Sequence, residues 1–379
     1  MKKSARLAAT GGLAAIAATG LFAGTSAAAT PQHATPHSAG NVFVQTDNTS
    51  GNSVVVYDRA ADGTLRQAGS YATGGLGGVL SGSAVDHLGS QGSLTYDRAA
   101  GLLYAVNPGS NTVTVFAVEG DRLVRREVLG SGGNFPVSVT VHGNVVYVLN
   151  ARDGGSVQGF LRLGSTLIRI PAWHRALGLE ASETPEFTST PGQVAFTPDG
   201  SKLIVTTKNN GNSIDVFDVD FAGGISARPV VTSDPGAVPF AVTFDPRGHV
   251  VVAEGANALA TFTLNRNNTL TLVDRVATGQ SATCWVSADG STLYTSNAGS
   301  GTLSRFQDGG SGQLTAQGNT ATDPGTVDAT VSSDGHELFA QTGANGVVDE
   351  FRVNANGSLT ELGSVTVPGS VGGEGIAAS

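Results

Sequence analysis

The sequence predicts an all-β protein, in which seven blades of four antiparallel strands form a closed ring, a β-propeller. Three observations predict this fold. A pattern of four short strands returns about every 42 to 55 residues, which is the length of one propeller blade. Glycine supplies 53 of the 379 residues, about twice its usual share of roughly 7%. The first and last copies of the pattern are each incomplete, and each holds what the other lacks.

Six copies of the pattern are complete. They begin at Gln91, Pro136, Pro191, Pro239, Ser281 and Thr326. The clearest read PGQVAFTPDGSKLIVTTKNNGNSIDVFDVD from Pro191, SATCWVSADGSTLYTSNAGSGTLSRFQD from Ser281 and TVDATVSSDGHELFAQTGANGVVDEFRVN from Thr326. The link between the first two strands repeatedly ends in glycine, as in Asp199-Gly200 and Asp289-Gly290, because such hairpins need a positive φ. Turns therefore account for the glycine excess.

One further blade, which brings the count to seven, is divided between the two ends of the repeat region. Residues 41–75 contain three strands, VFVQTD, SVVVYD and LRQAGSYA, without a first strand, and GEGIAAS at 373–379 resembles an isolated first strand. Pairing these segments closes the ring and leaves no open sheet edge. We therefore expect one propeller domain over 41–379. A row of independent β domains is the structural alternative, and it would not explain the divided copy.

The N-terminal segment has the pattern of a secretory signal peptide. Lys2, Lys3 and Arg6 precede an apolar run from Leu7 to Gly24, and small residues follow at 26–29. We expect a signal peptide over 1–29, a flexible lead-in over 30–40, and an extracellular mature protein that is not held in a membrane.

Charge and cysteine content exclude other classes. Loss of three basic residues with the leader changes the formal net charge from −9 to −12, which disfavours nucleic-acid binding. Cys284 is the sole cysteine, so no intramolecular disulfide forms. The sequence contains no P-loop, HExxH or CxxC motif, and we expect no cofactor, no metal and a monomer. His142 and His249 fall at first-to-second strand turns, where solvation explains them simply.

Three segments resemble the repeats of the seven-bladed lactonase propeller family, also described as YVTN-type repeats. They are LLYAVNPGSNTVTVF from Leu102, FTPDGSKLIVTTKNNGNSIDVF from Phe196 and SADGSTLYTSNAGSGTLSRF from Ser287. The resemblance covers essentially the whole mature chain. It implies the propeller fold, and it suggests a hydrolase of lactones, as in phosphogluconolactonase-type members. One propeller scaffold hosts many functions, so the resemblance is less specific for activity.

Candidate site residues lie in two sets of loops that share one face of a propeller: the links that precede inner strands, and the loops between second and third strands. For lactone hydrolysis, Glu254 or Asp328 would position or deprotonate water, and Lys208 or Arg152 would stabilise the oxyanion. We also expect substrate contacts from Gln193, Arg152, Asn150, Phe240, Trp285 and Asn297. The alternative is that these residues cap strands and solvate loops.

The chain departs from the phosphogluconolactonase pattern. Those members carry His, or Arg followed by His, just before inner strands, where this sequence has Gly192-Gln193 and Phe240-Ala241. Phosphogluconolactonase activity is therefore not expected. Two hypotheses stay open: a secreted lactonase-like hydrolase acting on another lactone or ester, and a non-catalytic extracellular propeller that binds a glycan, peptide or protein.

Two insertions interrupt the regular spacing. Residues 76–90 are rich in glycine and carry Asp86-His87, and this segment is a candidate lid over the channel. Residues 169–190 contain PAWHRALGLE, the one stretch with short helical character, together with Trp173 and Phe187. These aromatic side chains are expected to cover the space between two blades.

Overall fold

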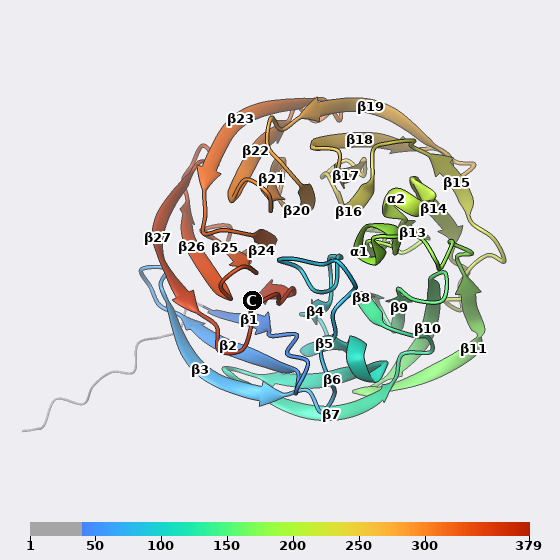
Figure 1. Ribbon diagram of the computed structural model, residues 1–379, viewed down its shortest axis with the longest axis horizontal. Coiled ribbons are helices and arrows are strands. Elements are labelled where there is room, and N and C mark those ends of the chain that lie inside the picture. The colour runs from blue at the N-terminus through green and yellow to red at the C-terminus, as the bar shows by residue number, and fades with distance from the viewer. Residues whose placement is uncertain (1–39) are drawn as a thin grey trace, which may run out of the picture. The chain divides into compact units, whose positions relative to one another are not determined.

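The computed structural model describes residues 40–379; the predicted leader and all but the last residue of the predicted lead-in lie outside the described residues. Within 40–379 the strands form seven four-stranded antiparallel sheets, placed as blades around a common centre (Figure 1). The predicted all-β propeller of seven blades is confirmed. Among the described residues, no helix is long and apolar enough to cross a membrane.

The blades are numbered here in chain order. Blade 1 consists of β28 (Ile376–Ala378), β1 (Gly40–Gln45), β2 (Ser53–Arg59) and β3 (Leu65–Ala72). Blade 2 consists of β4 (Leu94–Asp97), β5 (Leu102–Asn107), β6 (Thr112–Glu119) and β7 (Arg122–Gly130). Blade 3 consists of β8 (Pro136–His142), β9 (Val145–Asn150), β10 (Ser156–Leu163) and β11 (Thr166–Ala176). Blade 4 consists of β12 (Val194–Phe196), β13 (Lys202–Thr206), β14 (Ser213–Asp218) and β15 (Val230–Ser233).

The remaining blades follow the same order. Blade 5 consists of β16 (Pro239–Phe244), β17 (Val250–Glu254), β18 (Ala258–Leu264) and β19 (Leu270–Ala277). Blade 6 consists of β20 (Thr283–Asp289), β21 (Thr292–Asn297), β22 (Thr302–Asp308) and β23 (Leu314–Ala321). Blade 7 consists of β24 (Thr326–Val331), β25 (Glu337–Thr342), β26 (Val347–Val353) and β27 (Leu359–Thr366). Short helices η1 (Pro108–Ser110), α1 (Glu186–Ser189) and α2 (Lys208–Gly211) lie in loops.

The second strands show how the core is built. Every residue of β5 is buried, although its side chains alternate between the two faces of the sheet. Both faces are covered because each blade packs between two neighbours. The outer strand β3, by contrast, exposes most of its side chains. The core therefore consists of the layers between blades.

Ring closure joins the two ends of the described chain, as predicted. Strand β28 pairs with β1 in the register Val42 to Ala378, Phe43 to Ala377 and Val44 to Ile376. Ion pairs add to the junction between blades 1 and 7, because buried Arg59 of β2 donates to the exposed carboxylate of Asp334 at 2.7 Å and also to buried Glu337. The sheet edge that β1 would otherwise expose is paired.

One sequence expectation on local structure is wrong. The stretch PAWHRALGLE was assigned short helical character, but its first six residues belong to the outer strand β11. This strand pairs with β10 across a bulge near Phe160. Edge pairing with β10 outweighs the weak local helical preference of the segment. The helix of this insertion is α1, which begins later, at Glu186.

Candidate functional site

Two sets of loops form one face of the ring, which we call the mouth face: the links between blades and the loops between second and third strands. Because neighbouring strands are antiparallel, the turns between first and second strands and between third and fourth strands form the opposite face. Asparagine side chains fix the mouth loops. The amide oxygens of Asn111, Asn212 and Asn257 accept the backbone N–H of Phe135, Val238 and Ala282, respectively, each of which precedes the inner strand of the next blade.

The insertion at 76–90 extends into the centre of the ring (Figure 1). Trp285 of blade 6 donates its indole N–H to the Ser90 carbonyl at 2.7 Å. Gln91, at the end of the insertion, bonds both the N–H and the C=O of Val286 at 2.9 Å. The link therefore spans the channel from blade 2 to blade 6, and the candidate lid fills the channel.

Glycines provide the space for this insertion. A Cβ at Gly343 would lie 1.6 Å from the Val85 carbonyl oxygen, and one at Gly372 would lie 2.0 Å from a ring nitrogen of His87. Such approaches are closed to every other residue type. Glycine is therefore required for close backbone contacts with this insertion as well as for the hairpin turns.

The second insertion meets the first over the channel. Glu186 of α1 accepts Arg152 at 2.7 Å and the Ser81 N–H at 2.7 Å. The Phe187 N–H donates to the Ser81 carbonyl at 3.3 Å. Lys208 holds both insertions together. Its ammonium donates to Gly89 O and Phe187 O at 2.5 Å, and to Thr190 Oγ1 at 2.9 Å.

Lys208 is an unusual cation. It is fully buried, its Nζ lies 5.2 Å from the centre of the Phe240 ring, and burial lowers its pKa to about 7, against an opposing effect of the Asp86 charge. Its three protons all have oxygen acceptors. Lys208 therefore places a positive charge close to the channel without a free donor for a ligand.

A cavity of about 280 Å³ lies between the two insertions and blades 5 and 6. Its lining is largely apolar and includes the rings of Phe240 and Trp285, whose centres are 5.0 Å apart. The lining residues are Ser83, Ala84, Val85, Asp86, Gly89, Phe187, Phe240, Ala282, Cys284, Trp285, Ala298 and Gly299. Asp86 is the charged residue of this lining. We call this cavity the lid pocket.

Asp86 is held in place by the backbone of its own loop. Its carboxylate accepts the N–H of Leu88 at 2.8 Å and of Ser90 at 3.0 Å. Burial raises its pKa to about 6, although these N–H groups and the charge of Lys208 act in the opposite direction. A carboxyl with this pKa, in an apolar cavity, has the character of a general base that works near neutral pH.

Further carboxyls line the channel behind Asp86. Asp328 accepts the Ala329 N–H at 2.9 Å, and burial raises its pKa to about 7, with an added contribution from the charge of Asp86. Glu374 is fully buried, and its pKa is raised by burial and then by the charge of Asp328. Asp47 is buried too, and burial followed by the charge of Asp86 raises its pKa. We call Asp47, Asp86, Asp328 and Glu374 the channel carboxyls.

The structure brings together some of the residues selected from the sequence. Phe240 and Trp285 line the lid pocket, Lys208 lies against Phe240, and Asp328 interacts electrostatically with Asp86. Arg152 lines a separate cavity of about 170 Å³, over α1, and its guanidinium is 4.2 Å from the Phe135 ring.

The other selected residues lie within the blade framework. Glu254 is 1% exposed and pairs with Arg275 of β19 at 2.8 Å, and burial raises its pKa to about 7 against the effect of that arginine. Gln193 accepts the Val242 N–H at 2.6 Å, which joins blade 4 to blade 5. Asn297 bonds Thr283, Thr302 and Ser304 within blade 6. Asn150 is fully buried at the equivalent position of blade 3.

Asp86 and Glu374 were not among the candidate site residues predicted from the sequence. The Asp86-His87 pair was noted, but neighbouring side chains usually point apart, and no nucleophile motif accompanied it. Glu374 follows a glycine pair in the closing segment, where it resembled part of a strand. The available signal was that Asp86 lies in an insertion of the mouth face with few other charged residues.

These observations define a class of protein: a closed seven-bladed propeller whose channel is filled by an insertion and whose ligand pocket lies on the mouth face. The model of the family described as "Lactonase, 7-bladed beta-propeller" matches residues 78–372. The chain belongs to this lactonase family of seven-bladed β-propellers. Comparison with curated proteins found no match.

Solved structures of similar architecture support the fold. A Bacteroides fragilis protein provisionally assigned as a 6-phosphogluconolactonase has a TM-score of 0.71 at 19% identity, over 91% of this chain and 99% of that one. The periplasmic gluconolactonase PpgL of Pseudomonas aeruginosa has a TM-score of 0.70 at 19% identity, over 89% and 98%. A Lactobacillus plantarum protein has a TM-score of 0.70 at 19% identity, over 90% and 99%. At this identity the likeness concerns the fold alone.

Proposed function

We propose that the protein is an exported lactonase that hydrolyses a small, largely apolar lactone or related ester in the lid pocket, with Asp86 as the general base. The single observation that carries this proposal is the buried Asp86 carboxylate in an otherwise apolar cavity, with a pKa raised to about 6. Export rests on the signal-peptide pattern at 1–29, which the sequence alone supports.

The proposed reaction needs a base and a site that excludes bulk water. Ionised Asp86 takes a proton from a water molecule as this water attacks the lactone carbonyl. The tetrahedral intermediate then collapses with cleavage of the ring C–O bond, and protonated Asp86 returns the proton to the leaving alkoxide, which gives a hydroxy acid. The nearby positive charge of Lys208 favours the negative charge that develops on the carbonyl oxygen.

The chemistry of the lining supports an apolar substrate. Phe187, Phe240 and Trp285 provide aromatic surface, and no lysine or arginine stands among the described lining residues. A phosphorylated sugar lactone requires cationic partners for its phosphate. We therefore propose an uncharged lactone with an alkyl or aromatic substituent, and not a phosphogluconolactone.

A panel of lactones tests this proposal. Purified protein is assayed with γ- and δ-lactones of increasing alkyl length, with gluconolactone and with 6-phosphogluconolactone. We expect hydrolysis of alkyl lactones, with kcat/KM rising with pH through about 6 as Asp86 ionises and falling above about 7 as Lys208 loses its charge. Asp86→Asn should lower kcat/KM by roughly 10²- to 10⁴-fold.

The matched control is Glu119→Gln, which removes an exposed carboxylate that pairs with Arg126 at 2.9 Å at the outer end of β6. It should leave hydrolysis unchanged. Full activity of Asp86→Asn would overturn the assignment of the base. Glu254→Gln, measured in parallel, tests the sequence-based hypothesis that Glu254 carries the reaction.

A second candidate function is binding of the same class of ligand without hydrolysis. It is favoured by the hydrogen bonds of Lys208, whose three protons are all held by protein oxygens, so that the described cation donates nothing to an oxyanion. A lactone that raises Tm by mass action and is recovered intact would support this function.

A further inference from the structure

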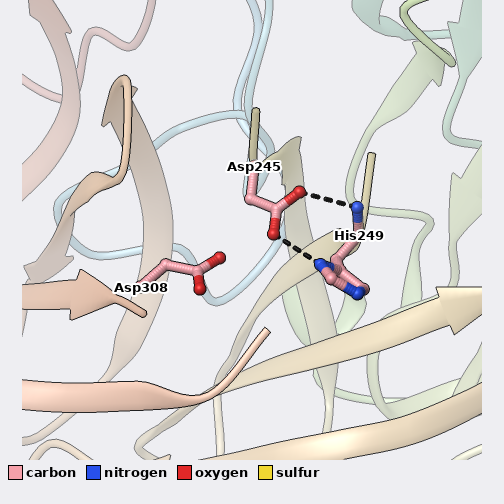
Figure 2. A group of neighbouring side chains, drawn as sticks. All are labelled: Asp245, His249 and Asp308. Carbon is pink, nitrogen blue, oxygen red and sulfur yellow. Dashed lines mark hydrogen bonds and ion pairs between the residues drawn. The ribbon is translucent and has the colours of Figure 1, made fainter. Parts of the chain in front are cut away.

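A second group of polar side chains lies on the face opposite to the mouth. Asp245 and His249 come from the turn between β16 and β17 of blade 5, and Asp308 ends β22 of blade 6 (Figure 2). Each residue presents one ligand atom, and these atoms all lie within 4.8 Å of one another. The group therefore joins two neighbouring blades, and it shares no residue with the lid pocket.

The two turns fix one oxygen of each carboxylate. Asp245 Oδ1 accepts the N–H of Arg247 and of His249, both at 2.8 Å. Asp308 Oδ1 accepts the N–H of Gly310 at 2.7 Å and of Gly312 at 3.2 Å. The second oxygen of each residue is left for the space between the blades. Figure 2 shows the Asp308 carboxylate directed toward Asp245.

The second oxygens of the two carboxylates differ in their partners. Asp245 Oδ2 lies 2.5 Å from His249 Nδ1, whereas buried Asp308 Oδ2 has no N–H or O–H donor within residues 40–379 and faces the Asp245 carboxyl, with which it can bond only through a shared proton. Asp245 is 4% exposed and Asp308 is 3% exposed. In the described part of the chain, His249 is the basic residue that pairs with these carboxylates, and neither forms an ion pair with Lys or Arg. A buried oxygen of this kind needs a proton or a cation.

We propose that Asp245, His249 and Asp308 form a binding site for a divalent transition metal, which links blade 5 to blade 6. One imidazole nitrogen and two carboxylate oxygens suit Zn²⁺, which accepts both donor types, better than Mg²⁺ or Ca²⁺, which favour oxygen ligands alone. The His249 side chain is 20% exposed, which leaves an outer position of the metal open to water.

Metal binding replaces the hydrogen bond inside the group. The proton between His249 Nδ1 and Asp245 Oδ2 leaves to solvent, because the ring nitrogen must donate its lone pair to the metal. The Asp308 oxygen gains the positive partner that the chain does not supply. Since the ligands come from two blades and from turns that the backbone has already ordered, the metal acts as a structural link between sheets.

The test uses purified protein freed of metal with a chelator and then titrated with Zn²⁺. We expect wild-type protein to take up one Zn²⁺ at this site and Tm to rise by several degrees at saturating metal. Co²⁺ in place of Zn²⁺ should give visible absorption bands of a nitrogen- and oxygen-ligated ion. Asp308→Asn should abolish the Tm rise and the bands, and His249→Gln should weaken binding at least tenfold.

Two controls keep the test decisive. His142→Gln changes a histidine in the equivalent turn of blade 3, where the ring contacts Phe196, and it should bind Zn²⁺ as wild type does. Asp308→Asn should fold without metal, because its amide N–H can donate to Asp245, and its circular dichroism and metal-free Tm check this. Equal Zn²⁺ uptake and equal Tm shifts in wild type and Asp308→Asn would overturn the proposed metal site. The two carboxyls would then share a proton instead of a metal ion.

Discussion

The carboxyl groups on the two faces of the ring have different surroundings. On the mouth face, the channel carboxyls are buried with pKa values raised by desolvation. On the opposite face, Asp334 is held by Arg59 at 2.7 Å, which keeps the pKa of its carboxyl well below the usual range. An arginine thus pairs with carboxylates at the junction of blades 1 and 7, whereas the insertion in the channel is surrounded by buried carboxyls whose pKa values are raised. This difference is typical of a site that is maintained at a cost in stability.

The largest expected effect on stability comes from removing the hydrogen bonds by which Lys208 holds the two insertions on the mouth face. Lys208→Met leaves Gly89 O, Phe187 O and Thr190 without their buried donor, so we expect a loss of about 2–4 kcal/mol in the free energy of unfolding. The insertion at 76–90 should also become sensitive to protease. Urea denaturation and limited proteolysis measure both effects.

Lysine 202 provides the matched control on the opposite face. Its ammonium pairs with the exposed carboxylate of Asp218, and such surface pairs contribute about 0–1 kcal/mol. Lys202→Met should therefore unfold nearly as wild type does and keep the insertion protected. Equal losses for the two variants would contradict the role of Lys208 as the residue that fastens both insertions.

The next prediction concerns the pH dependence of stability, which should have opposite signs for carboxyls on the two faces. The pKa of Asp328 is raised to about 7, so the folded protein holds this proton more tightly than the unfolded chain does. The resulting stability is present below the unfolded pKa, near 3.8, and is lost as pH rises through about 7. Asp328→Asn mimics the protonated form and should be more stable than wild type at pH 8, by roughly 1–3 kcal/mol.

Asp334→Asn should show the reverse. Because Arg59 lowers the pKa of Asp334, its contribution is present above the unfolded pKa and is lost as pH falls through the lower folded value. This variant should be less stable than wild type at pH 8, and the gap should narrow in acid. Thermal unfolding of both variants from pH 2 to 8 checks the opposite signs, because the contribution of Asp334 is lost only below its unfolded pKa near 3.8; parallel curves would remove the contrast between the faces.

The smallest effect compares equivalent positions within the mouth face. Asn297 accepts Thr283 Oγ1 at 2.6 Å and donates to Ser304 Oγ at 2.9 Å, whereas both amide atoms of Asn150 are buried without a partner in the described chain. Asn297→Ala should cost about 1–2 kcal/mol, and Asn150→Ala should cost about 1 kcal/mol less, because no hydrogen bond is lost there. Urea unfolding at neutral pH measures the difference, and a larger loss at Asn150 would indicate a ligand or water contact for its amide.

The sequence was sufficient for the fold because the fold repeats. Each copy carries the same hairpin glycine and the same alternation, and the divided first blade predicts the pairing that closes the ring. The helical assignment at PAWHRALGLE failed because β10 offered an edge that local preference does not reveal. Repetition therefore predicts architecture more securely than any single segment does.

The site was less predictable because it departs from the repeat. Glu254 takes the place of the usual asparagine, and Lys208 lies one residue after the equivalent position, which is Thr207. Nothing in the sequence distinguishes a lysine that holds two insertions from a glutamate paired with Arg275. Asp86 gains its character from the cavity around it, which requires the path of the insertion through the channel. The metal-ligand group likewise depends on two turns that are 59 residues apart in the sequence, from His249 to Asp308.

The pairing of β28 with β1 sets the order of events during synthesis. Asn41 gains its partner Ser379 only after the chain has grown by a further 338 residues. Until then the first blade presents an unpaired strand edge, and the ring has a gap where blades 1 and 7 meet. A contact this distant in sequence forms late and slowly. A chain that has not yet made β28 therefore cannot complete the ring.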